Sequence, residues 1–208
     1  MGMLSAIYGD PPDARVIYNG RDAADCEIVP KQPVVTSAGR LWDEAKNIRQ
    51  LAYASDNIKA PVKIAGDLKT EDEYSRFHNV RFLGKLPGKD VRTEMASSMI
   101  YAAPARYEPF GLCILVAAMC GCALVLGNIP SLRELWKDNA VYVETDNADS
   151  LANACNRLLE DPYTAAEYGN RAKRHSAMFS LEIMGRRYLE LYDELVKASH
   201  AMRTVQIA

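Results

Sequence analysis

The sequence predicts an α/β fold, a Rossmann-like doubly wound parallel sheet with helices on both faces and a helical C-terminal tail. Three observations predict it. Short apolar runs rich in β-branched residues alternate with helical patterns, the connections between them are short, and no strand pattern follows Pro162. Strand–helix alternation of this kind requires right-handed crossovers, which place parallel strands between two layers of helices.

The expected strands are short and apolar, and the expected helices lie between them. We expect strands at Val16–Tyr18, Val34–Ala38, Val62–Ala65, Val80–Leu83, Ile100–Ala103, Ala123–Leu126 and Val141–Val143. We expect helices near 43–56, 69–77, 89–98, 111–120, 131–137 and 149–160, then about 163–178 and 180–200. In the last of these, RRYLELYDELVKA has apolar residues at the i, i+3, i+4 spacing of a helix with one apolar face.

The length of the chain predicts one domain, 1–208. Its 208 residues, 49% of them hydrophobic, suffice for one sizeable core and are too few for two. Residues 1–33 contain four prolines and are expected to form a short strand and a long loop. Residues 163–200 are expected to form C-terminal helices, and the apolar face of the helix at 181–199 is expected to be partly exposed or to form a contact between copies of the chain.

Composition excludes several classes of protein. A formal net charge of −2 gives no reason to propose nucleic acid or an anionic membrane as partner. No apolar run reaches the roughly 18–20 residues of a membrane span, so we expect no integral membrane segment. The three histidines are scattered, and no metal site is expected. The five cysteines lack metal-ligand spacing, and we expect buried, reduced thiols in a cytoplasmic protein, with a redox-active Cys120-Gly-Cys122 as the alternative. The cysteines are Cys26, Cys113, Cys120, Cys122 and Cys155.

Ligands of doubly wound sheets bind outside the carboxyl ends of the strands, and SAGRLWDEAKN follows an expected strand there. Gly39 and Arg40 come directly after the strand, and Lys46 is expected about two turns further along the chain. A bidentate guanidinium and a mobile ammonium suit a diphosphate. Alternatively, Arg40 pairs with Asp43 or Glu44 and Lys46 is a solvated helical lysine. The loop has neither G-x-G-x-x-G nor G-x-x-x-x-G-K-[ST], so it does not indicate an NAD site or a P-loop.

EPFGL, which follows the strand expected at 100–103, places a carboxylate at the top of a buried strand. Pro109 biases Glu108 toward extended geometry, and Gly111 permits a positive φ. The helix that begins near Gly111 presents N–H groups, which suit anionic or hydroxyl-rich ligands. Glu108 is therefore expected to accept hydrogen bonds from sugar hydroxyls beside those amides. Alternatively, its carboxylate caps the helix. A third loop, AGD at 65–67, is expected to be structural.

Taken together, these segments resemble the C-terminal domain of group 1 (family 4) retaining glycosyltransferases of the GT-B architecture, which has two Rossmann domains. The resemblance is ordered along nearly the whole chain. It covers VIYNG (16–20), GRLWDEAKN (39–47), IAGD (64–67), VRFLG (80–84), YAAPARYEPFGL (101–112), LVLGNIPSLREL (124–135) and VYVETDNADSLANACNRLLEDP (141–162).

The resemblance implies a domain that binds a nucleotide-sugar donor and uses no bound metal or other cofactor. It implies catalytic roles for Arg40 and Lys46, which would contact the donor diphosphate, and for Glu108, which would hold hydroxyls of the transferred sugar. It also implies that backbone amides of Phe110–Leu112 face the sugar and the phosphate. Charge placed against the leaving diphosphate acts more strongly in the transition state than in the ground state, as catalysis requires.

The chain departs from the family pattern in two places. Val116 stands where the family has a second glutamate that holds the ribose, and the loss of such a charge-assisted contact costs about 1.5–3 kcal/mol. The acceptor-binding N-terminal Rossmann domain is not in the sequence, so we expect a fragment that is inactive alone. Val116 favours an alternative, a non-catalytic domain for binding or assembly, and Arg40, Lys46 and Glu108 count against it. A receiver-like domain is disfavoured because Asp67 alone is no acidic cluster.

Overall fold

The computed structural model describes residues 9, 14–22, 26–27, 29–67 and 77–205. The chain divides into two compact units. Residues 23–177 form the larger unit, and residues 1–22 with 178–208 form the smaller one. The predicted site residues all belong to the larger unit.

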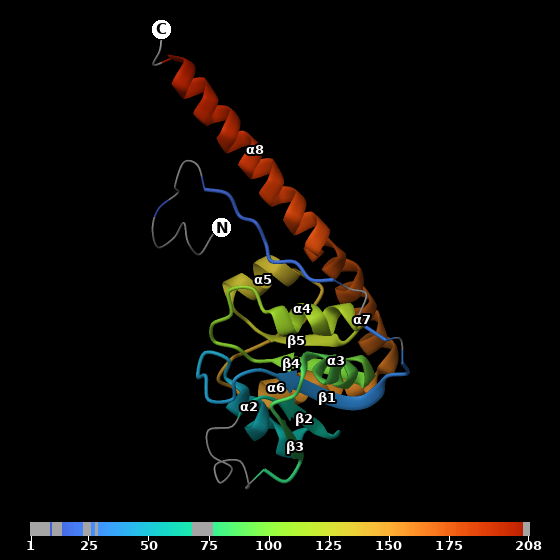
Figure 1. Ribbon diagram of the computed structural model, residues 1–208. Coiled ribbons are helices and arrows are strands. Elements are labelled where there is room, and N and C mark those ends of the chain that lie inside the picture. The colour runs from blue at the N-terminus through green and yellow to red at the C-terminus, as the bar shows by residue number, and fades with distance from the viewer. Residues whose placement is uncertain (1–8, 10–13, 23–25, 28, 68–76, 206–208) are drawn as a thin grey trace. The chain divides into compact units, whose positions relative to one another are not determined.

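The larger unit is built on a six-stranded parallel sheet with the strand order β3-β2-β1-β4-β5-β6 (Figure 1). Its strands are β1 Gln32–Ala38, β2 Val62–Ala65, β3 Val80–Gly84, β4 Ser98–Ala103, β5 Ala123–Gly127 and β6 Val141–Val143. Every neighbouring pair is parallel. The strand order reverses between β1 and β4, and a doubly wound sheet places its ligand site outside the carboxyl ends of such a pair.

Helices cover both faces of the sheet, as the sequence predicts. They are α2 Ile48–Ala54, α3 Gly88–Ser97, α4 Leu112–Met119, α5 Pro130–Trp136, α6 Ala148–Glu160 and α7 Pro162–Ser176. Helices α2 and α6 pack together on one face, whereas α4 packs with α3 and α7 on the other (Figure 1). Local signals start several of them. Asn147 caps α6 by accepting from the Ser150 amide. Helix α7 begins with Pro162, and the Asp161 carboxylate caps it by accepting from the Thr164 amide.

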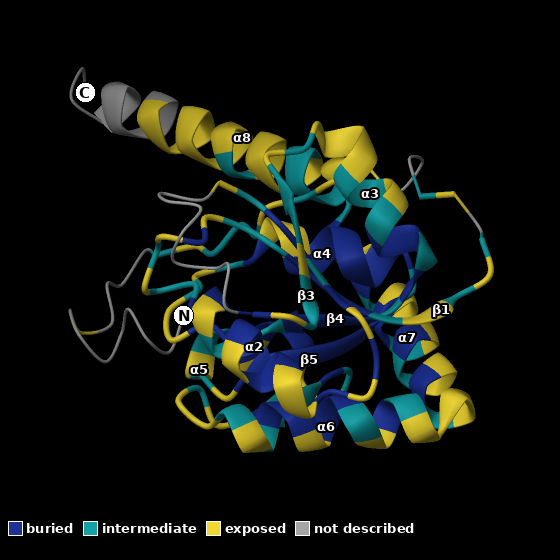
Figure 2. Ribbon diagram, turned by 90° about the horizontal axis from the view of Figure 1, so that it is seen from below, coloured by how far each residue is buried: buried dark blue, intermediate teal, exposed yellow. Residues whose placement is uncertain are grey.

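The core of this unit lies between the sheet and its helices, where the buried residues gather (Figure 2). It consists of apolar side chains that alternate along the strands and recur on the inner faces of the helices. Members that are fully buried include Val35, Leu51, Val62, Ile64, Ile100, Val125 and Leu151. Because both faces of the sheet are covered, the inner strand β5 is apolar and buried along its whole length, as is typical of parallel sheets.

The smaller unit joins an N-terminal segment to helix α8, Leu181–Val205. Arg21 forms a parallel bridge with Ser180, and its amide donates to the Phe179 carbonyl at 2.9 Å. The rings of Tyr18 and Phe179 meet edge to face at 5.7 Å. The exposed apolar residues of α8 include Tyr188, Leu189, Tyr192, Leu195 and Val196. Within the described residues, no helix combines the length and the apolarity that a membrane span requires.

Six of the seven expected strands are confirmed, and the seventh is wrong. Val16–Tyr18 is not a strand, because Tyr18 packs on Phe179 in the smaller unit and does not join the sheet. The helix expected at 43–56 begins only at Ile48 and is followed by a 3-10 turn at Ser55–Asn57. The helix expected near 69–77 falls, except for its last residue, outside the described residues.

The expectation that all five cysteines are reduced thiols is wrong. Cys26 and Cys120 form a disulfide, with their Cα atoms 5.2 Å apart. Ninety-four positions separate the two in sequence, so their spacing gave no indication of the pair. Cys113 is exposed, and Cys122 and Cys155 are buried. Burial raises the pKa of the Cys122 thiol to about 11 and that of Cys155 to about 12, so both are inert at neutral pH.

Candidate functional site

The end of β1 is fixed by its two neighbouring strands. The Tyr101 hydroxyl on β4 donates to the Ala38 carbonyl at 3.1 Å, and burial raises the pKa of Tyr101 well above its ordinary value. On the other side, the Gly39 amide donates to the Ala65 carbonyl of β2 at 3.0 Å. Gly66 has a φ of 154°, and a Cβ there would collide with the Gly39 carbonyl. AGD therefore has a structural role, because Gly66 lets the loop after β2 lie directly against the loop after β1.

The loop after β1 folds into successive turns that place Lys46 before the helix. The Asp43 amide donates to the Arg40 carbonyl at 3.1 Å, and the Lys46 amide donates to the Asp43 carbonyl at 3.0 Å. The Asp43 carboxylate also accepts from the Ala45 amide at 3.0 Å. These local bonds compete with helix formation, which explains why the expected helical position of Lys46 is wrong.

Arg40 pairs with Asp43, as the alternative interpretation of this loop predicts. Its guanidinium donates to the Asp43 carboxylate at 2.6 Å and lies 5.2 Å from the centre of the Trp42 ring. The Arg40 side chain is nevertheless 59% exposed. A guanidinium has five N–H donors, so one carboxylate leaves others available to an anion.

Lys46 and Glu108 are brought together by the fold. The Lys46 ammonium donates to Oε2 of Glu108, and the two side chains are only 26% and 13% exposed. The interpretation of Lys46 as a solvated helical lysine is therefore wrong. Sequence patterns placed both residues at the edge of the sheet but did not predict that they pair.

Backbone hydrogen bonds hold the loop after β1 against the loop after β4. The Ala45 carbonyl accepts from the amides of Arg106 and Tyr107 at 2.9 and 3.2 Å. The Ser131 hydroxyl, from the start of α5, donates to the Glu108 carbonyl at 2.7 Å. The carboxylate of Glu108 is thus presented from a backbone that is fixed on two sides.

The EPFGL turn leads directly into α4. Gly111 has a φ of 81°, as its residue type predicts, and a Cβ there would lie 2.7 Å from Cδ1 of Ile114. Phe110 lies in the bend, and Leu112 begins the helix with an exposed side chain. The first N–H groups of α4 have no carbonyl one turn earlier in the helix to accept them, so they suit an anion or a hydroxyl-rich ligand.

Val116 is buried, with an exposed fraction of 8%. It belongs to a run on α4 that is buried from Ile114 to Met119. This stretch of helix is therefore part of the core.

Sequence reasoning missed Asn47, which links three loops at this edge. Its side-chain amide donates to the carbonyls of Pro104 and Thr145, at 2.9 and 2.6 Å. The available signal was an asparagine directly before an apolar helical pattern, which is typical of a helix cap. Here Asn47 does occupy the cap position, but its side chain makes no capping hydrogen bond.

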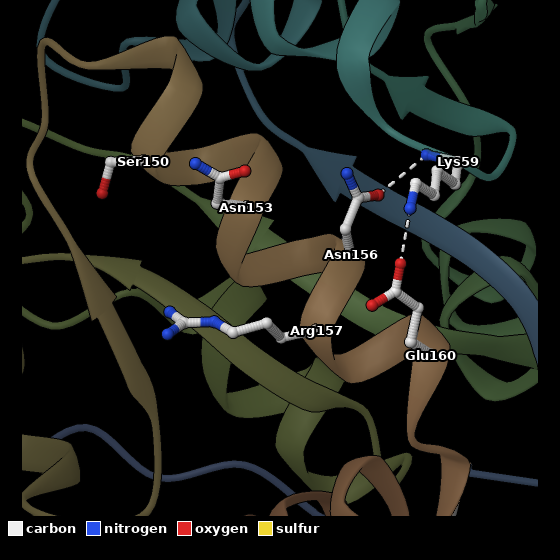
Figure 3. A pocket seen from close by; sticks show the side chains of 6 residues that line it. All are labelled: Lys59, Ser150, Asn153, Asn156, Arg157 and Glu160. Atoms are coloured by element: carbon white, nitrogen blue, oxygen red, sulfur yellow. Dashed lines mark hydrogen bonds and ion pairs between the residues drawn. The ribbon is translucent and has the colours of Figure 1, made fainter.

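A pocket of about 650 Å³ opens elsewhere, on the outer side of α6 (Figure 3). Its lining is polar and consists of Lys59, Ser150, Asn153, Asn156, Arg157 and Glu160. The Lys59 ammonium pairs with Glu160 at 2.6 Å, and its amide donates to Asn156 at 2.8 Å. None of the predicted site residues lines this pocket, and we assign no ligand to it.

The fold and the cluster at the carboxyl edge define an α/β protein with cationic, carboxylate and helix N-terminal groups around the switch point of its sheet. The family model of the group 1 glycosyl transferases matches residues 21–175. The chain therefore belongs to this family, and the resemblance to group 1 glycosyltransferases of the GT-B architecture is confirmed.

Individual relatives agree with this assignment. An uncharacterised glycosyltransferase of Methanocaldococcus jannaschii is 27% identical, over 76% of this chain and 48% of its own length. Among solved structures, sucrose-phosphate synthase of Thermosynechococcus elongatus has a TM-score of 0.83 at 22% identity, over 95% of this chain and 56% of its own. HepE of Anabaena, solved with UDP and glucose, has a TM-score of 0.77 at 24% identity, over 86% and 57%. These likenesses show a shared fold, and the chain spans about half the length of these relatives.

Proposed function

We propose that this chain is the donor-binding part of a retaining glycosyltransferase, which transfers a sugar from a nucleoside diphosphate sugar to an acceptor. The observation that carries the proposal is the Lys46–Glu108 pair beside the N-terminus of α4. The pair and the first turn of α4 lie at one edge of the sheet, and in the proposal the cation binds phosphate while the carboxylate and the backbone amides bind the sugar. The HepE complex with UDP and glucose supports the same ligand chemistry for a protein of this fold.

Each predicted site residue has a role in this proposal. Arg40 and Lys46 hold the diphosphate and neutralise the charge that grows on the leaving nucleoside diphosphate, which lowers the barrier to transfer. Glu108 accepts hydrogen bonds from the hydroxyls of the transferred sugar. Gly39 and the Phe110–Leu112 turn bring backbone close to the donor. No metal ion or other cofactor is required, because these cations and amides supply the electrostatic stabilisation.

The remaining groups of the reaction come from outside this chain. We propose that an N-terminal Rossmann domain binds the acceptor, and that residues 1–208 form one donor-binding domain that binds donor but does not transfer sugar alone. The exposed apolar face of α8 is proposed to form a contact between copies when the chain is isolated. We propose a cytoplasmic location. The expectation that all five cysteines are reduced does not support this location, because Cys26 and Cys120 form a disulfide.

Titration calorimetry with UDP, GDP, ADP and their sugar conjugates tests the donor site. We expect the wild-type chain to bind at least one of these nucleotides. Lys46→Ala should weaken that binding about tenfold to a hundredfold, the equivalent of one charge-assisted contact. Lys59→Ala is the matched control, because Lys59 also forms an ion pair but lies outside the site. Absence of binding by every nucleotide at millimolar concentration contradicts the proposal, as does equal loss of affinity in the control.

A second candidate function is a non-catalytic domain for nucleotide or sugar binding, or for assembly. The observation that favours it is Val116, which is apolar and buried where the family has its second glutamate. The two candidates differ in whether the chain, joined to its acceptor domain, transfers sugar. A full-length protein that binds nucleotide sugar, yet transfers none to any acceptor and does not hydrolyse the donor, would favour the second.

A further inference from the structure

We propose that Asn47 is a positioning residue that sets the distance between Lys46 and Glu108 for the nucleotide sugar. The proposal rests on the proposed function and names a residue that touches no ligand in it. Asn47 follows Lys46 directly, and Pro104 lies four residues before Glu108. The side chain of Asn47 donates to the Pro104 carbonyl, so it connects the two loops from which the pair projects.

The contacts of Asn47 use both hydrogens of its side-chain NH2 group. Its Nδ2 donates to Pro104 at 2.9 Å and to Thr145 at 2.6 Å, and the residue is only 5% exposed. Both partners are backbone carbonyls, which can only accept, so the NH2 group must face them. Pro104 follows β4 and Thr145 follows β6, whereas Asn47 follows β1. One buried side chain therefore joins three loops at the carboxyl edge of the sheet.

The backbone of Asn47 adds a second requirement. Its φ of 52° and ψ of 31° lie in the left-handed region, which few non-glycine residues occupy. Asparagine adopts this conformation more readily than most other residues, and glycine adopts it freely but has no side-chain amide to donate. Aspartate has the same shape as asparagine, but its carboxylate oxygens can only accept hydrogen bonds, as can the two carbonyls that they would face. Of these three residues, only asparagine meets both requirements.

The backbone position of Asn47 also fixes that of Lys46, its neighbour in the chain. The amides of Lys46 and Asn47 both donate to the Asp43 carbonyl, at 3.0 and 3.3 Å, so the turn ends in a fixed direction. The left-handed step at Asn47 then aims the chain into α2. A misplacement of about 1 Å at a reacting group can cost about a hundredfold in rate, so control of this position matters to transfer.

Asn79 provides a matched control elsewhere in the same unit. Its Nδ2 donates to three backbone carbonyls, those of Ser55, Ile58 and Ala60, at 2.7, 3.1 and 3.3 Å. These partners precede β2 and lie toward the amino end of the strands. Replacement of Asn79 removes a comparable set of hydrogen bonds without a connection to Lys46 or Glu108.

The first test measures the interaction of Lys46 with Glu108 without any nucleotide. A double-mutant cycle with Lys46→Met and Glu108→Gln gives their coupling from urea unfolding. We expect coupling in the wild-type and Asn79→Gly backgrounds, and its loss to within error in Asn47→Gly, which keeps the left-handed backbone. Asn47→Asp is the second background if Asn47→Gly unfolds, and it should also lose the coupling. Coupling between Lys46 and Glu108 that persists in Asn47→Gly or in Asn47→Asp overturns the proposal.

The second test measures UDP, GDP and ADP binding by calorimetry, at a temperature where all variants are folded. We expect Asn47→Gly to weaken binding of the preferred nucleotide about tenfold, and Asn79→Gly to leave it unchanged although it too lowers the melting temperature. Equal affinity in Asn47→Gly and wild type overturns the positioning role. If wild type binds no nucleotide, the proposed function fails, and the double-mutant cycle still decides whether Asn47 sets the pair.

Discussion

At the scale of single residues, Lys46 and Glu108 are charged partners before any ligand arrives. Both side chains are largely buried, so neither is freely solvated. An incoming diphosphate would give Lys46 a second anionic partner, and sugar hydroxyls would give Glu108 donors that replace part of the lysine contact. On the proposed function the pair prepares the site in advance, because the ammonium and the carboxylate are already held together where we propose that the diphosphate meets the sugar.

Glu108→Gln should separate sugar recognition from diphosphate binding. We expect the dissociation constant of the free nucleoside diphosphate to change less than about threefold, because Lys46 stays and gains freedom to meet phosphate. The preference for the sugar conjugate over the free diphosphate should fall about tenfold, because a neutral amide accepts weaker hydrogen bonds than a carboxylate. Calorimetry with both ligands measures the ratio. An unchanged ratio would place sugar recognition elsewhere.

The place of these residues at the edge of the sheet was predictable from the sequence, but their pairing was not. Glu108 follows a buried strand and precedes a turn with glycine, so its place at the sheet edge follows from local pattern. Its partner is 62 positions away, and nothing local indicates that Lys46 would pair with it. The Arg40–Asp43 contact, at a separation of three, was within reach of local reasoning and was foreseen as an alternative.

At the scale of elements, α4 combines two roles. Its first turn faces the proposed ligand, whereas the rest of the helix is core, with Val116 among the buried residues. The helix was predicted from its apolar run and from the glycine before it. The short strands were predicted equally well, since their apolar runs end at turn residues. The start of α2 was misplaced because Asp43 holds a turn that a helical pattern does not reveal.

Val116→Glu tests whether this position belongs to the core. A carboxyl group buried there should have a folded-state pKa above the unfolded value of about 4.3, because burial disfavours the charged form. The variant should then lose about 2–3 kcal/mol of unfolding free energy at pH 8. The deficit should shrink as the pH falls through the raised folded-state pKa toward that unfolded value, below which the carboxyl is neutral in both states. Urea unfolding at pH 8 and pH 5 measures the difference.

Cys113→Glu is the control for Val116→Glu, since it introduces the same charge at an exposed position of α4. We expect it to change the unfolding free energy by less than about 0.5 kcal/mol at either pH. If Val116→Glu instead keeps full stability and tightens UDP binding about tenfold, the side chain reaches the ribose. That result would also remove the main support for the non-catalytic alternative.

At the scale of the whole molecule, local patterns predicted the sheet but not how distant segments join. Short connections and right-handed crossovers account for the neighbouring pairs β1–β2, β2–β3, β4–β5 and β5–β6, but not for the step from β3 to β4, which crosses to the other side of β1. The contact of Tyr18 with Phe179 joins segments from opposite ends of the chain, and no local sequence pattern predicts it. The disulfide between Cys26 and Cys120 is a further long-range link, and it ties the segment before β1 to the end of α4.

Counting reactive thiols tests this part of the structure. In the native chain, prepared without reductant, we expect Ellman's reagent to react with Cys113 alone at pH 8. A pKa of about 11 or 12 leaves at most about one thiolate in a thousand at Cys122 or Cys155, and burial excludes the reagent. Denaturation should expose three thiols, and reduction before denaturation should expose all five. Cys113→Ser should abolish the native signal, whereas Cys26→Ser should give four thiols on denaturation without reductant. Five thiols in the unreduced, denatured wild type would show that Cys26 and Cys120 are not joined and would restore the expectation of reduced thiols.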